Sequence, residues 1–309
     1  MHKISGTYCA SLTPVNEDYS INKKLFLSHC QNLLSQNIDG LAIFGTTGEA
    51  NSFNVDEKIE ALQFLIENNI NVKDLIPGTG QCSIQDTVRL TKTCSSLNVK
   101  AVLVLPPFYY KNVTDEGIIN YFRRVVEEVN DNNLKYILYN IPKVSGVSIS
   151  FDMIEKLIRL FPNNIVGMKD SSDDLDNMLK VTKYFNNFSL FSGSDSLALK
   201  VCKHGGAGAI TATANISGKL LSFIVKNCHN NLEIENFDLL QDLQERIRET
   251  LFSHEQISAL KAYLSIQEKN DEWNRVNPPL QKILNPSSHK TIIGLIQLLK
   301  TMDELIPPS

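Results

Sequence analysis

A lysine directly after a buried apolar run has the clearest chemical potential in this sequence. Lys169 follows Ile-Val-Gly-Met at 165–168, so its side chain leaves a strand whose surroundings are apolar. Desolvation disfavours the ammonium there and favours the neutral amine, which is the nucleophilic form. Such an amine can condense with a ketone, and the protonated imine that results stabilises a carbanion next to the former carbonyl. The alternative is a lysine neutralised by Asp170 or another carboxylate.

A tyrosine near this lysine could move the protons that Schiff-base chemistry requires. Tyr139 ends the strand-like run that precedes the run ending at Lys169. Catalytic groups of barrel enzymes gather where the strands end, so the phenol could lie beside the amine, and Thr47 could hydrogen-bond it. A phenol in that position can transfer protons between amine, hydroxyl and substrate oxygen. A packing role is the alternative for Tyr139.

Two glycine-rich segments could bind an anion. Residues 45–49, Gly-Thr-Thr-Gly-Glu, offer backbone N–H groups and two hydroxyls before a helical stretch, which suits a carboxylate or a phosphate. Residues 205–208, Gly-Gly-Ala-Gly, resemble a phosphate loop. They precede a strand, however, and so lie at the wrong end of it for catalysis. A tight turn is the favoured interpretation of this second segment.

Strand-like and helical patterns alternate along most of the chain. Short apolar runs indicate strands at 7–12, 40–44, 74–77, 100–105, 135–139, 165–168, 188–191 and 207–211. Amphipathic stretches lie between them, such as 114–130, where Thr114 can cap the helix, and 151–161 behind a Ser150 cap. The repeated strand and helix predict an α/β fold, a (β/α)8 TIM barrel over residues 1–228.

The strand signals stop after about residue 216. Helical patterns follow at 220–227, 239–251, 255–267 and 291–302. The first is expected to close the barrel. The others are expected to form a helical region over 229–309 that packs on the barrel, because no linker rich in Gly, Ser or Pro precedes it.

Composition excludes several classes of protein. The chain has 309 residues, a formal net charge of -4 and 42% hydrophobic residues, which is too apolar for disorder and too acidic for a nucleic-acid or anionic-membrane partner. The longest aliphatic run, 101–105, is too short to span a bilayer, and the N-terminus lacks an apolar signal segment. Six cysteines without CxxC spacing indicate a reducing cytoplasm, and the histidine spacing predicts no bound metal.

Six short motifs together resemble one known family. They are GTTGE at 45–49, PFYY at 107–110, YNIP at 139–142, GMKDS at 167–171, SGSD at 192–195 and GAGAI at 206–210. In this order and spacing they are similar to the dihydrodipicolinate synthase and N-acetylneuraminate lyase family of pyruvate-dependent class I aldolases. The resemblance implies a TIM barrel with C-terminal helices and a covalent lysine imine with pyruvate instead of a separate cofactor. It also implies homotetramers built from tight dimers.

The resemblance also implies roles for individual residues. Lys169 would form the Schiff base, and Tyr139 would be the phenol that shuttles protons. Thr46 and Thr47 would bind the pyruvate carboxylate, with Thr47 also linking Tyr139 to Tyr110. Tyr110 matches the tyrosine that family members typically insert into the site of a neighbouring subunit.

Some residues depart from the pattern of dihydrodipicolinate synthases. Those enzymes bind the carboxylate of aspartate semialdehyde with an arginine two residues beyond the YNxP proline. The residue at this position is Val144 here. The usual lysine-feedback site is also altered: its two histidine positions are Val55 and Lys58, and its asparagine position is Cys82. Val144 therefore argues against synthesis of dihydrodipicolinate, which stays the first alternative.

The remaining motif residues define a candidate substrate pocket. By the resemblance, Gly193 and Ile210 would line it beside the imine. The candidates for binding a polyhydroxylated or short acidic substrate partner are Ser171, Ser194, Asp195 and Ser196. The favoured reaction is cleavage of a 4-hydroxy-2-oxo acid, such as a 2-keto-3-deoxy sugar acid, N-acetylneuraminate or 4-hydroxy-2-oxoglutarate, to pyruvate and an aldehyde.

Two further hypotheses stay open. A barrel that senses small oxo acids would bind pyruvate without reductive trapping at Lys169. A phosphate-binding lyase or isomerase would be inhibited by phosphate and would keep its activity in Lys169→Ala.

Overall fold

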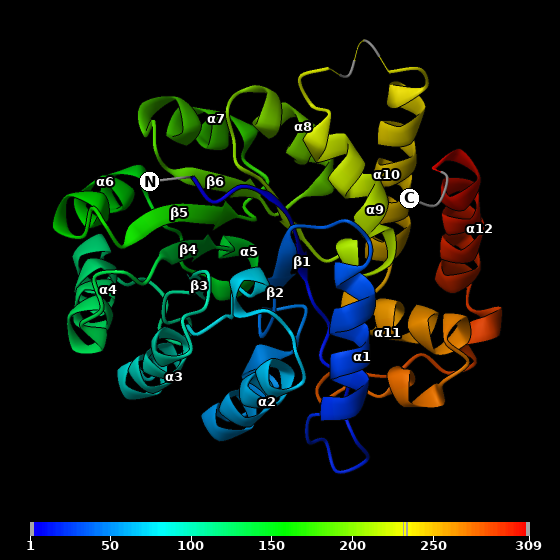
Figure 1. Ribbon diagram of the computed structural model, residues 1–309, viewed down its shortest axis with the longest axis horizontal. Helices are drawn as coiled ribbons and strands as arrows, with labels where there is room; N and C mark the ends of the chain where they lie inside the picture. Colours follow the sequence, from blue (N-terminus) through cyan, green and yellow to red (C-terminus); the bar gives the residue numbers. More distant parts are fainter. Residues whose placement is uncertain (1–2, 231, 233, 307–309) are drawn as a thin grey trace.

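Seven parallel strands form one sheet that curves into a nearly closed barrel (Figure 1). The computed structural model describes residues 3–230, 232 and 234–306. The strand order is β2-β1-β7-β6-β5-β4-β3, and helices surround the sheet, so the predicted (β/α)8 TIM barrel is confirmed. The strands are β1 (Gly6–Ala10), β2 (Gly40–Ala42), β3 (Val102–Val104), β4 (Tyr136–Asn140), β5 (Ile165–Asp170), β6 (Ser189–Ser192) and β7 (Gly208–Thr211).

An extended segment at 75–79 closes the barrel between β2 and β3. The N–H groups at positions 76 and 79 donate to carbonyls of β2 and β3 over 2.8 and 2.9 Å. The strand predicted at 74–77 is nevertheless wrong as a regular strand, because Val72–Asp74 forms a 3-10 helix and only isolated bridges follow it. Pro77 lies within this segment and has no N–H to donate to a ladder.

Helices cover the outside of the sheet. The capping predictions are confirmed: the hydroxyl of Thr114 accepts from the N–H of Gly117, and that of Ser150 from Met153, each over 3.2 Å. The helices are α1 (Lys23–Leu34), α2 (Val55–Glu67), α3 (Ile84–Ser96), α4 (Asp115–Val129), α5 (Pro142–Ser145), α6 (Phe151–Leu160), α7 (Leu175–Tyr184) and α8 (Asp195–Lys203).

The C-terminal helices share one apolar core with the end of the barrel. They are α9 (Ala214–Lys226), α10 (Phe237–Phe252), α11 (Gln256–Gln267) and α12 (Lys290–Leu305), with 3-10 turns at Asp271–Asn274 and Pro286–Ser288. The four predicted helices are confirmed, and the first begins earlier than expected. Leu220, Leu243, Leu260 and Leu295 of these helices pack in one cluster with Leu12 from the loop after β1. Since this cluster crosses residue 228, the domain boundary there stays a prediction.

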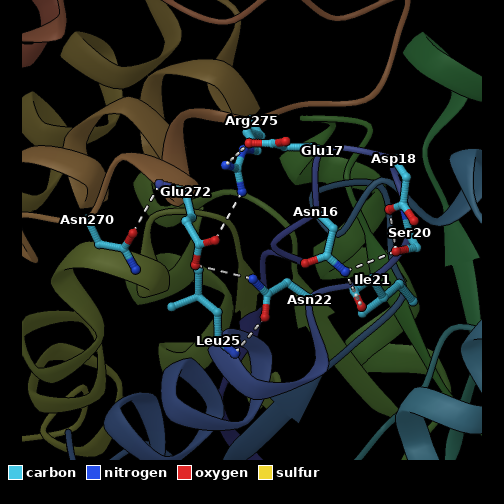
Figure 2. A network of polar contacts seen from close by, with 10 residues as sticks. All are labelled: Asn16, Glu17, Asp18, Ser20, Ile21, Asn22, Leu25, Asn270, Glu272 and Arg275. Carbon is cyan, nitrogen blue, oxygen red and sulfur yellow. Dashed lines mark hydrogen bonds and ion pairs between the residues drawn. The ribbon is translucent and has the colours of Figure 1, made fainter.

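Polar contacts join the loop after β1 to the segment after α11 (Figure 2). The carboxylate of Glu272 accepts from the Asn22 amide over 3.4 Å and from Arg275 over 3.2 Å. Arg275 also donates to Glu17 over 3.0 Å, and Asn22 caps α1 by accepting from the N–H of Leu25. This loop follows the C-terminal end of β1. The helical region is therefore attached at the end of the barrel where catalytic groups gather.

Within 3–230, 232 and 234–306, no helix combines the length and the apolarity needed to cross a membrane. The cytoplasmic location stays a prediction.

Candidate active site

Lys169 and Tyr139 lie opposite one another on neighbouring strands. The two residues are register partners between β5 and β4, and alternation along each strand points both side chains into the barrel. The Nζ of Lys169 lies 3.3 Å from the phenol oxygen of Tyr139 and 4.4 Å from the centre of its ring. Both side chains are buried. The predicted proximity of amine and phenol is therefore present in the fold.

Asp170 does not neutralise the lysine. As the next residue of the strand it points away from the barrel interior. Its carboxylate accepts from the amide of Asn140 over 3.1 Å and from the N–H of Ser172 over 2.8 Å. Burial raises the pKa of the Asp170 carboxyl above its ordinary value. Among the ion pairs of the described residues, Lys169 takes part in none.

The threonine that contacts the phenol is Thr46. Its Oγ1 lies 3.3 Å from the phenol oxygen of Tyr139. The expectation that Thr47 makes this contact is wrong, because the tight turn at 45–49 directs the first hydroxyl toward β4. Backbone bonds from Gly48 to Gly45 and from Glu49 to Thr46, each 3.1 Å, hold this turn. Thr47 is buried beside it.

A buried ion pair fixes the end of this turn. The carboxylate of Glu49 pairs with the ammonium of Lys261 on α11, and both side chains are excluded from solvent. Glu49 also accepts from the N–H of Asn277 over 2.7 Å, and Lys261 donates to the carbonyl of Arg275 over 3.0 Å. The C-terminal region therefore holds the loop that carries Thr46. A lysine within the apolar run of α11 was the one sequence signal for this contact.

A cavity of about 150 Å³ opens above the lysine. It brings together seven of the predicted site residues, namely Thr46, Thr47, Tyr139, Lys169, Ser171, Gly193 and Ile210. Gly193 has no room for a side chain, because a Cβ there would lie 2.0 Å from the Oγ of Ser171. Within the described ranges, no group of three or more His, Cys, Asp or Glu side chains could hold a metal ion.

Four other predicted residues lie outside this cavity. Ser194 and Asp195 are buried at the start of α8, and Ser196 follows them. None of these three lines the cavity, so their contact with a substrate stays a prediction. The Asp195 carboxylate instead lies 3.5 Å from Arg248. Tyr110 is 74% exposed in the single chain, so its role in a neighbouring subunit stays a prediction.

Residues 205–208 form a turn at the opposite end of the barrel, as expected. Gly205 has a φ of +88° and Gly208 a φ of +138°, both in the region that favours glycine. A Cβ on Gly208 would also lie 1.9 Å from the carbonyl oxygen of Gly6 in β1.

Comparison with known proteins places this site in a family. A model of the dihydrodipicolinate synthetase family matches residues 3–291. The 4-hydroxy-tetrahydrodipicolinate synthase of Listeria monocytogenes is 36% identical over 220 residues, which are 70% of this chain and 73% of that protein. The chain belongs to the dihydrodipicolinate synthetase family. The resemblance inferred from the six motifs is confirmed, and the protein is an enzyme of the lyase and aldolase kind.

Solved structures share this fold over nearly the whole chain. N-acetylneuraminate lyase from Fusobacterium nucleatum is 27% identical with a TM-score of 0.83, and the match covers 96% of this chain and 98% of that one. A variant of 2-keto-3-deoxygluconate aldolase from Sulfolobus solfataricus is 22% identical with a TM-score of 0.86, covering 97% and 98%. The C-terminal helices therefore belong to the common architecture.

Further residues line the cavity, and of those named next only the position of Val144 had been singled out in the sequence. Lys143 and Val144 of α5 and Asp173 of the loop after β5 lie at its mouth. The C-terminal helices add Arg248 and Phe252 of α10 and Gln256 of α11. No sequence signal marked this second group, since its members lie far along the chain from every motif.

Proposed function

We propose that this enzyme is a class I aldolase that binds pyruvate as an imine on Lys169. The observation that carries the proposal is the contact between a buried amine and a phenol at the inner end of a cavity. Thr46 lies on the other side of the same phenol. The row of amine, phenol and hydroxyl gives Lys169 a neighbour that can take up and return a proton.

The reaction in the cleavage direction uses these groups in four steps. The amine of Lys169 adds to the C2 carbonyl of a 4-hydroxy-2-oxo acid, the phenol of Tyr139 gives its proton to the departing hydroxyl, and water leaves as the protonated imine forms. The C4 hydroxyl gives its proton to the phenolate of Tyr139 while the C3–C4 bond breaks, and the electron pair moves to the imine nitrogen. The aldehyde departs and the enamine takes a proton at C3. Water then hydrolyses the imine, which releases pyruvate and restores the amine.

The turn at 45–49 supports binding of the pyruvate carboxylate. Thr46 and Thr47 both line the cavity, as does Lys169. Gly193 and Ile210 form the apolar wall beside the imine. Such a wall limits the access of water while the enamine is present.

A hydroxylated 2-oxo acid suits the outer part of the cavity better than aspartate semialdehyde. Val144 lies there and is 63% exposed, so the position of the usual arginine offers no charge to a carboxylate. The second candidate is 4-hydroxy-tetrahydrodipicolinate synthase, which condenses pyruvate with aspartate semialdehyde. The names of the Listeria relatives favour it.

Reductive trapping tests the common step. Pyruvate and borohydride should add covalent mass to the peptide that holds Lys169, and Lys169→Ala should abolish the adduct. Lys183→Ala, an exposed lysine on α7, is the matched control and should be trapped like the wild type. Pyruvate release from a panel of 4-hydroxy-2-oxo acids, run beside aspartate semialdehyde with pyruvate, then separates the two candidates. Absence of any adduct at Lys169 would refute both.

We also propose that the enzyme works as a homotetramer built from tight dimers. Tyr109 and Tyr110 are 75% and 74% exposed in the single chain, with their rings edge to face at 5.3 Å. Large exposed aromatic side chains are typical of interfaces between subunits. Sedimentation equilibrium should give four copies, and Tyr110→Ala should shift the assembly toward smaller species and lower the activity.

A further inference from the structure

Three charged side chains from separate elements meet across the mouth of the cavity. Lys143 extends from α5, Asp173 from the loop after β5 and Arg248 from α10. The ammonium of Lys143 lies 2.7 Å from one carboxylate oxygen of Asp173, and the guanidinium of Arg248 lies 4.0 Å from the other. Asp173 is therefore held between two cations at the place where the part of a substrate beyond C4 would lie.

Arg248 is itself fixed in place. Its guanidinium lies 3.5 Å from the buried carboxylate of Asp195 and 4.2 Å from the centre of the Phe252 ring. The arginine side chain is only 16% exposed. The position of Arg248 is thus set by packing, and its charge is shared between two carboxylates.

The charges at the mouth and directly behind it balance one another. Lys143 and Arg248 supply two positive charges, and Asp173 and Asp195 supply two negative charges. A second carboxylate on the substrate would meet Asp173 at close range and would have to compete with it for both cations. An uncharged substrate part meets no such repulsion.

Hydrogen-bond acceptors are available in the same wall. The carboxylate of Asp173 has lone pairs beyond those facing its two cations. The side-chain carbonyl oxygen of Gln256, which also borders the cavity, is buried and has no hydrogen-bond partner among the described residues. Ser171, which also lines the cavity, adds a hydroxyl. Sugar hydroxyls are donors that would satisfy these acceptors.

We propose that Asp173, held by Lys143 and Arg248, is the specificity-determining residue and accepts hydrogen bonds from hydroxyls of an uncharged polyhydroxylated substrate part. The preferred substrates are then 3-deoxy-2-oxo sugar acids, and compounds with a second carboxylate are poor substrates. This inference rests on the proposed aldolase function and names its substrate class.

Two variants at neighbouring aspartates test the role of this carboxylate. Asp173→Asn keeps the shape of the side chain but removes its charge and its attraction for the two cations. Asp174→Asn makes the same chemical change one residue further along. Asp174 caps α7 by accepting from the N–H of Asn177 over 3.0 Å, and asparagine caps a helix about as well.

The assay measures kcat/KM for 2-keto-3-deoxygluconate and for 4-hydroxy-2-oxoglutarate, which carries a second carboxylate. The wild type should prefer the sugar acid by at least about 10-fold, and Asp173→Asn should lower kcat/KM for it by about 10- to 100-fold, as expected for loss of a charged acceptor. The same variant frees two cations, so its relative activity on 4-hydroxy-2-oxoglutarate should rise. Asp174→Asn should behave like the wild type.

Borohydride trapping of pyruvate separates failure of this inference from failure of the proposed function. Normal trapping in Asp173→Asn shows that the variant is folded and that its Lys169 is intact. The inference is overturned if the wild type prefers 4-hydroxy-2-oxoglutarate or cleaves no sugar acid. It is also overturned if Asp173→Asn keeps the wild-type kcat/KM for the sugar acid. With trapping retained, any of these results leaves the aldolase assignment standing. Loss of trapping in the wild type overturns both.

Discussion

The buried ion pair between Lys261 and Glu49 connects the C-terminal helices to the catalytic turn. The two side chains have exposed fractions of 0% and 1%, and Glu49 ends the turn that carries Thr46 and Thr47. Lys261→Met keeps a long side chain of similar volume and removes the positive charge. We expect this variant to be less stable and to bind pyruvate more weakly, because Glu49 loses its cation.

The expected loss of stability depends on which partners the Glu49 carboxylate retains in this variant. Its carboxylate would retain the N–H of Asn277 at 2.7 Å as its partner. Removing one member of a buried ion pair typically costs about 3–5 kcal/mol, since the other charge stays buried. Desolvation lowers the pKa of Lys261, with Glu49 opposing that shift, so burial of the lysine already has a cost of its own. The expected loss is therefore about 3 kcal/mol, at the lower end of that range.

Urea unfolding followed by tryptophan fluorescence measures this loss. Trp273 is the only tryptophan and is fully buried in the segment after α11, so it reports on this region. Lys300→Met, at an exposed position of α12, is the control and should stay within about 0.5 kcal/mol of the wild type. The double variant Glu49→Gln with Lys261→Met should recover part of the stability, because no charge then stays buried alone. A loss below about 1 kcal/mol in Lys261→Met would refute the reasoning.

Two further predictions concern the phenol and a second buried lysine. Tyr139→Phe keeps the ring but removes the proton carrier, so kcat should fall by about 10²- to 10⁴-fold with the fold intact; a loss under about 10-fold in steady-state kinetics would contradict the role. Lys58 is buried, and desolvation lowers its pKa from 10.5 to about 8. At this position the unfolded chain binds more protons than the folded one between pH 8 and 10.5, so Lys58 contributes a rise in the free energy of unfolding across that window. Burial raises the pKa of the Cys30 and Cys94 thiols, which act in the opposite direction, so the contribution of Lys58 is read from the difference between wild type and variant. Lys58→Met should be more stable than the wild type at pH 7, and this difference in urea melts should shrink between pH 8 and 10.5; a difference that stays constant over that range would contradict the prediction.

The fold follows from local patterns in the sequence. The alternation of short apolar runs with amphipathic stretches predicts every strand of the sheet, because parallel strands covered by helices need apolar residues on both faces. The run at 74–77 satisfies the same pattern but does not form a regular strand. A 3-10 helix occupies its start, and Pro77 removes a donor, so only isolated bridges remain.

Local sequence patterns also determine the part of the site that lies on the strands. The step of two residues along a strand fixes which side chains enter the barrel, so the positions of Lys169 and Tyr139 at the strand ends could be predicted. The assignment of the hydroxyl contact to Thr47 was wrong, because a turn has no such regular alternation. The direction of each threonine depends on the hydrogen bonds that close the turn.

The sequence by itself determined the barrel, the motifs and the pair of Lys169 and Tyr139. Only the tertiary structure decided that Arg248 and Gln256 enter the cavity, that Lys261 holds Glu49, and that Asp195 turns inward. The physical reason is that local periodicity sets the direction of a side chain within its own element. The packing of the helices on the barrel decides which distant element that side chain contacts. Spacing along the chain does not predict this packing.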